Sequence, residues 1–116
     1  MARVLLVEDD ATIAALYALK LRLDGHSVRL AADGAAARHW VARERPDVIC
    51  LDVRLPDVSG GELAGSLAAR GAPVILLTND EAGFQDPPAP VARALLKAAT
   101  SPSQLSATIA ELLQGR

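Results

Sequence analysis

The chain has 116 residues, a formal net charge of −2, and a composition that is 51% hydrophobic and 22% charged. These values predict one globular domain over residues 1–116, with no room for a second, DNA-binding domain, and the single cysteine excludes an internal disulfide bond. Lys and Arg are scattered rather than clustered, and no apolar run approaches the length of a membrane span, so we expect a cytoplasmic protein with no nucleic-acid or membrane partner.

Short apolar runs alternate with segments of helical periodicity along the chain. The run "RVLLV" at 3–7 is almost wholly apolar, which is typical of a strand buried on both faces of a parallel sheet. From Thr12 onward apolar residues recur every three or four positions, which predicts a helix that Asp10 or Thr12 caps and that the turn at 24–26 ends. The same patterns predict further strands at 27–31, 47–53, 73–78 and 91–98 and further helices at about 34–44, 61–70 and 101–113.

One segment breaks this alternation. Residues 79–90, "NDEAGFQDPPAP", contain a glycine and three prolines, which argues against a regular helix between the fourth and fifth strands. The remaining order predicts an α/β fold, with a doubly wound, five-stranded parallel sheet that helices cover on both faces. In such sheets, ligands bind beyond the carboxyl ends of the strands.

Polar residues follow the apolar strands at that edge of the predicted sheet. They are Glu8, Asp9 and Asp10 after the first strand, Asp52 at the end of the third, Thr78 at the end of the fourth and Lys97 at the end of the fifth. Crowded carboxylates repel, by about 4 kcal/mol for two unit charges about 4 Å apart at an effective dielectric constant of about 20. A Mg²⁺ ion with oxygen ligands would compensate this repulsion. The alternative for the first three acids is a solvated turn in which one of them caps a helix.

A carboxylate beside Mg²⁺, with a hydroxyl and an ammonium in reach, predicts a phosphoryl-transfer site. An aspartate can be the nucleophile in such a site and becomes an aspartyl phosphate. The metal and Lys97 would stabilise the charge on the phosphoryl oxygens during transfer.

Four stretches, "VLLVEDD", "DVICLDVRLPDVSGGEL", "PVILLT" and "LLKAATSPSQL", together resemble the receiver domain of two-component response regulators, which is CheY-like. The resemblance covers nearly the whole chain and implies a flavodoxin-like fold of five βα units in a stand-alone receiver, a phosphoacceptor rather than an enzyme. It implies that Asp52 accepts a phosphoryl group from a histidine kinase or a phosphotransfer protein and that the chain signals to a downstream protein. The further roles that it implies are Mg²⁺ binding by Asp9, Asp52 and the main-chain carbonyl of Arg54, a water-mediated metal contact by Glu8, and phosphoryl contacts by Thr78 and Lys97.

The second half of the chain departs from the family pattern. The segment at 79–90 is short and rich in proline where the family has its fourth helix, so we expect that helix to be shortened or irregular. Ala98 replaces a proline that follows a cis peptide bond in the family. Because a cis bond before a non-proline residue costs about 3 kcal/mol, we predict a trans Lys97–Ala98 bond. Ala94 replaces a Tyr or Phe whose rotation reports phosphorylation, and Asn79 replaces a small residue.

Three functions remain open from the sequence. The first is a single-domain response regulator that signals through protein contacts, with a homodimer left open, or that acts as a phosphate sink. The second is a pseudo-receiver, an interaction module with little or no phosphorylation, which the altered segment at 79–98 favours. The third is a small phosphatase of the haloacid dehalogenase type, but such enzymes need a second Asp two residues after the nucleophile, where this chain has Arg54. The sequence identifies neither the cognate kinase nor the downstream target.

Overall fold

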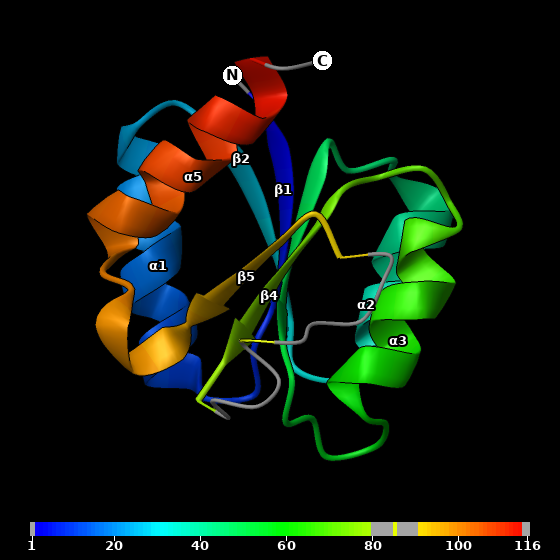
Figure 1. Cartoon of the computed structure of the whole chain (residues 1–116). Coiled ribbons are helices and arrows are strands. Elements are labelled where there is room, and N and C mark those ends of the chain that lie inside the picture. Colours follow the sequence, from blue (N-terminus) through cyan, green and yellow to red (C-terminus); the bar gives the residue numbers. More distant parts are fainter. Residues whose placement is uncertain (1, 80–84, 86–90, 115–116) are drawn as a thin grey trace.

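The computed structural model describes residues 2–79, 85 and 91–114, which have the alternating α/β order that the sequence predicts (Figure 1). The strands are β1 (Arg3–Val7), β2 (Ser27–Ala31), β3 (Val48–Asp52), β4 (Val74–Thr78) and β5 (Arg93–Leu96). The helices are α1 (Ala11–Leu23), α2 (Gly34–Arg43), α3 (Gly60–Ala68) and α5 (Pro102–Gln114), and a short 3₁₀ helix, η1, spans Lys97–Ala99. None of the helices in the described ranges combines the length and the apolar character that crossing a membrane requires.

The five strands form one parallel sheet in the order β2-β1-β3-β4-β5. Figure 1 shows α1 and α5 on one face of this sheet and α2 and α3 on the other, so the predicted doubly wound arrangement is confirmed. The chain moves outward from β1 to β2 and then returns past β1 to β3. The carboxyl ends of β1 and β3 therefore lie side by side at the switch point, which is where open α/β sheets bind their ligands.

Each face of the sheet packs against its own hydrophobic core. Val4 and Leu6 of β1 belong to the core formed with α1 and α5, whereas Leu5 and Val7 belong to the core formed with α2 and α3. Because side chains alternate between the two faces and both faces are buried, the strand is apolar at successive positions. Cys50 is fully buried in the first of these cores, and burial raises the pKa of its thiol to about 12, so this cysteine serves packing rather than redox chemistry.

The C-terminal part of the sheet differs from the sequence prediction. The predicted bounds of the fifth strand, 91–98, are wrong. Strand β5 covers Arg93–Leu96, because the chain turns at Lys97 into η1. No peptide bond in the described part of the chain is cis, so the predicted trans Lys97–Ala98 bond is confirmed. The prediction of an irregular segment at 79–90 falls outside the described residues, apart from positions 79 and 85.

Candidate functional site

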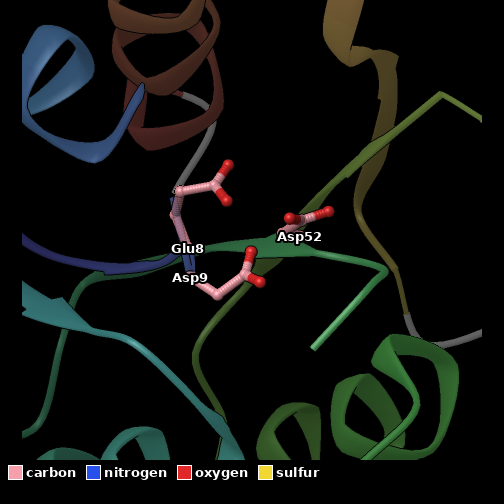
Figure 2. A group of neighbouring side chains, drawn as sticks. All are labelled: Glu8, Asp9 and Asp52. Atoms are coloured by element: carbon pink, nitrogen blue, oxygen red, sulfur yellow. The ribbon is translucent and has the colours of Figure 1, made fainter. Parts of the chain in front are cut away.

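Three carboxylates from two adjacent strand ends meet at the switch point. Glu8 and Asp9 directly follow β1, and Asp52 is the last residue of β3, whose register pairs Val7 with Leu51. One carboxylate oxygen from each of the three residues lies within 4.8 Å of the others. Figure 2 shows the three side chains projecting toward a shared space. We call Glu8, Asp9 and Asp52 the acidic cluster; Glu8 and Asp52 are buried, and Asp9 is exposed.

Lys97 supplies the positive charge that faces this acidic cluster. Its Nζ lies 2.5 Å from Glu8 Oε1 and 3.0 Å from Asp52 Oδ2. Burial alone lowers the pKa of Lys97, but its contacts with Glu8 and Asp52 outweigh burial, so the pKa is raised and the ammonium stays charged. Burial raises the pKa of Glu8, and the contacts with Lys97 and with the Asp10 N–H offset only part of that increase. Three carboxylates against one ammonium leave an excess of negative charge, which a divalent cation would balance.

The other residues that the sequence placed at this edge line the same cleft, which has a volume of about 540 Å³. Thr78 ends β4 and is almost fully buried. Arg54 follows β3 closely, and its N–H donates to Asp52 Oδ1 at 3.2 Å, which fixes the turn that leaves the strand. The structure thus brings together every residue of the predicted site.

Asp10, the third acid in the run after β1, has a different role. Its Oδ1 accepts hydrogen bonds from the N–H groups of Thr12 at 2.9 Å and Ile13 at 3.0 Å, so Asp10 is the N-cap of α1. A cap of this kind satisfies N–H groups that have no partner within the helix. Asp10 is therefore tied to the helix, and the acidic cluster has three members rather than four.

Asp57, for which the sequence pattern predicts no role, holds the loop after β3 in place. Its two carboxylate oxygens accept hydrogen bonds from Gly34 N–H at 2.8 Å and Ala35 N–H at 3.0 Å, at the N-terminus of α2. The bond from Gly34 is the main reason that the pKa of Asp57 is lowered. Ser59 then caps α3 by accepting from Glu62 N–H at 3.2 Å. The loop that starts beside Asp52 is thereby fixed at both of its helical neighbours.

The segment that contains these site residues matches a known protein family. The family model of the response regulator receiver domain matches residues 4–98, which include the acidic cluster, Thr78 and Lys97. This chain belongs to the response regulator receiver family. As a receiver domain it is a phosphoacceptor of two-component signalling rather than a catalytic enzyme, and receiver domains accept phosphate from histidine kinases.

Curated relatives of this receiver are longer proteins. It is 41% identical over 81 residues to the probable transcriptional regulatory protein TcrX of Mycobacterium tuberculosis and 40% identical over 78 residues to the response regulator MprA of Mycobacterium leprae. These stretches cover 68% and 66% of this chain but 35% and 34% of the two relatives. The matched part is thus about a third of each relative's length.

Solved receiver structures share the fold along nearly the whole chain. The response regulator protein TrrA of Thermotoga maritima, in complex with Mg²⁺–BeF, has a TM-score of 0.86 at 26% identity, over 97% of this chain and 99% of that one. A CheY-like receiver domain protein of Methanospirillum hungatei has a TM-score of 0.89 at 25% identity, over 99% of this chain and 95% of that one. The five-stranded parallel sheet in the order 2-1-3-4-5 is thus the receiver fold.

Gly60 of the receiver is the position where a small substitution should disturb the loop after Asp52. A Cβ added there would lie 2.4 Å from Val53 Cα and 2.8 Å from Val53 O, and these backbone atoms cannot rotate away as a side chain can. We expect Gly60→Ala to lower the free energy of unfolding by about 1–3 kcal/mol, measured by urea denaturation.

Gly65→Ala is the matched control for this substitution, because Gly65 lies within the same helix and its added Cβ meets no atom within 4 Å. The control should raise the free energy of unfolding by about 0.5–1 kcal/mol, since alanine favours helix over glycine. Equal stability of Gly60→Ala and the wild type would show that the loop after Asp52 adjusts without strain.

Proposed function

We propose that this receiver accepts a phosphoryl group on Asp52, in a Mg²⁺-dependent reaction, from a histidine kinase or a histidine phosphotransfer protein. The observation that carries the proposal is the acidic cluster at the carboxyl ends of adjacent strands, two of whose members, Glu8 and Asp52, contact the Lys97 ammonium. In the transfer, one carboxylate oxygen of Asp52 forms a bond to phosphorus while the bond from phosphorus to the donor atom breaks. The donor atom keeps that electron pair and takes up a proton.

The residues present fit a Mg²⁺ ion. Three carboxylates within 4.8 Å of one another offer the oxygen ligands that this ion prefers, and one ammonium leaves their charge incompletely balanced. We assign direct binding to Asp9, Asp52 and the main-chain carbonyl of Arg54, and a water-mediated contact to Glu8. When bound, the ion supplies positive charge to the phosphoryl oxygens. The TrrA complex with Mg²⁺–BeF supports, by similarity, a Mg²⁺ ion in a protein of this fold.

Lys97 and Thr78 complete the proposed site by contacting the phosphoryl group. The contact between the Lys97 ammonium and Asp52 supports a role for Lys97 in stabilising the negative charge that a phosphoryl group brings to that carboxylate. The Thr78 hydroxyl, at the end of the neighbouring strand β4, would donate to a phosphoryl oxygen. Both residues line the cleft that contains Asp52.

We propose that the phosphorylated receiver signals by contacting another protein, or that it acts as a phosphate sink. Self-association is one form that such contacts could take. A cytoplasmic location belongs to the same proposal, because receiver domains typically work there. Since the matched part is about a third of TcrX and MprA, the activity of those longer proteins is not transferred to this chain.

Intact-mass measurement tests the proposal directly. The protein is incubated with Mg²⁺ and acetyl phosphate, and its mass is followed from the shortest accessible times. We expect the mass of one added phosphoryl group. No such addition should occur when a chelator removes Mg²⁺ before the incubation. A protein that stays unmodified at all times would favour the pseudo-receiver, and phosphotransfer from the histidine kinases of the source organism would then be the deciding screen.

A further inference from the structure

We propose that Asn79 is a positioning residue for phosphoryl transfer, because it holds the main chain beside Lys97 and thereby places the Lys97 ammonium. This inference rests on the proposed function. It extends that function to a residue outside the acidic cluster. Asn79 lines the same cleft as Asp52 and Lys97, but none of its described contacts is with the three carboxylates of the acidic cluster.

The contact that carries the inference joins the ends of two neighbouring strands. Asn79 directly follows Thr78 at the end of β4, and Ala98 directly follows Lys97 after β5. The Ala98 N–H donates to Asn79 Oδ1 at 2.8 Å. A proline at position 98 would have no N–H to donate, so this bond depends on two of the residues in which the chain departs from the family pattern, Asn79 and Ala98. These two departures therefore form one interacting pair.

The far end of the Lys97 loop, which we define as residues 97–100, is fixed by a separate anchor. The Tyr17 hydroxyl, on α1, donates to the main-chain carbonyl of Thr100 at 2.8 Å. The Thr100 hydroxyl donates to the Leu96 carbonyl at 2.7 Å, which closes the turn. Tyr17 thus ties the end of the Lys97 loop to α1, whereas Asn79 ties its start to β4. The loop is thus held by α1 at one end and by the residue after β4 at the other.

The position of the Lys97 main chain matters because the charge that it carries acts over short distances. The ammonium lies 2.5 Å from Glu8 and 3.0 Å from Asp52, so a small displacement of the loop changes both contacts. Lysine is a point charge on a flexible stem, and its effect on a phosphoryl group depends on where that charge is held. Loss of the Asn79 bond should therefore slow phosphorylation while leaving the exposed turn folded.

The first test is a double-mutant cycle between Asn79 and Lys97. Asn79→Ala should slow phosphorylation by acetyl phosphate in saturating Mg²⁺ by about 3-fold to 10-fold, the range expected for one lost hydrogen bond. In a Lys97→Ala background the same substitution should have no further effect, because Asn79 acts through Lys97. Gln104→Ala is the matched control, since the Gln104 side-chain amide also accepts a hydrogen bond from an exposed main-chain N–H, that of Ser101 at 2.7 Å.

The second test reads the position of Lys97 without phosphorylation. The chain has two lysines, Lys20 and Lys97, so the ammonium signal of Lys97 can be assigned by NMR with a Lys20→Ala variant. Asn79→Ala should shift this signal in the unphosphorylated protein, and Gln104→Ala should not.

The outcomes separate the two proposals. An unchanged Lys97 signal, or equal slowing of phosphorylation with and without Lys97, would overturn the positioning role. A shifted Lys97 signal in a protein that is never phosphorylated would support the positioning role of Asn79 and overturn the proposed function alone.

Discussion

Asp52→Asn should abolish phosphorylation of this receiver, with a decrease of at least about 100-fold in phosphoryl incorporation. The carboxylate of Asp52 is the nucleophile in the proposed reaction, and an amide has no anionic oxygen with which to attack phosphorus. Asparagine keeps the shape of the side chain and one oxygen, so the turn bond from Arg54 N–H can persist. It also removes one of the crowded charges, and Lys97 retains Glu8 as a partner. Intact mass after incubation with Mg²⁺ and acetyl phosphate measures the effect, and circular dichroism checks the fold.

The matched control is Asp47→Asn, at the opposite end of the same strand. Asp47 precedes β3, and its Oδ2 accepts a hydrogen bond from Arg3 N–H at 2.8 Å, far along the strand from the acidic cluster. This variant should be phosphorylated at the wild-type rate. If Asp52→Asn gained a phosphoryl group as the wild type does, another residue would be the acceptor, and peptide mapping would identify it.

The fold was predictable wherever a strand is buried on both faces. Strands β3 and β4 are buried at every position, so their sequences are apolar up to their last residues, Asp52 and Thr78, and their bounds differ from the prediction by one residue at one or both ends. Strand β5 lies at the edge of the sheet and buries its side chains only in part. The turn at Lys97 depends on contacts with other elements rather than on the pattern of the strand itself, so the prediction ran on to residue 98.

The members of the site were predictable because topology gathers them. The carboxyl ends of parallel strands meet at one edge, so Glu8, Asp9 and Asp52 could be placed together from the strand pattern alone. The bonds that hold the surrounding loops could not be placed in this way. Asp57 binds the start of α2 at Gly34, and Asn79 binds Ala98, in each case across about twenty residues of sequence. No local periodicity marks such a pairing, since the side chain and its main-chain partner belong to different elements.

The acidic cluster needs a positive charge beside it, and the hydrogen bonds of the Lys97 loop help to hold that charge in place. The cluster concentrates negative charge at the end of the sheet, and Lys97 is the cation that offsets it in the described structure. That cation comes from a loop outside the sheet's regular pairing, so its place depends on the anchors of the loop as well as on β5. A change at Lys97 should therefore affect the stability of the metal-free protein as well as the chemistry.

Lys97→Ala should lower the free energy of unfolding by about 2 kcal/mol in Mg²⁺-free buffer, because it leaves the buried carboxylates of Glu8 and Asp52 without their counter-charge. Saturating Mg²⁺ should restore most of this loss, since the ion binds the folded cluster and takes over the role of the ammonium. Even then, phosphorylation should be slower than in the wild type by at least about 10-fold, because the ion does not replace the contact with the phosphoryl group. Urea denaturation with and without Mg²⁺ measures the change in stability, and intact mass over time measures the rate of phosphorylation.

The chain's other lysine provides the control. Lys20 forms an exposed ion pair with Asp24 at 3.0 Å, so Lys20→Ala should change stability by less than about 0.5 kcal/mol and leave phosphorylation unaltered. Wild-type phosphorylation of Lys97→Ala would show that the assigned role of Lys97 is wrong.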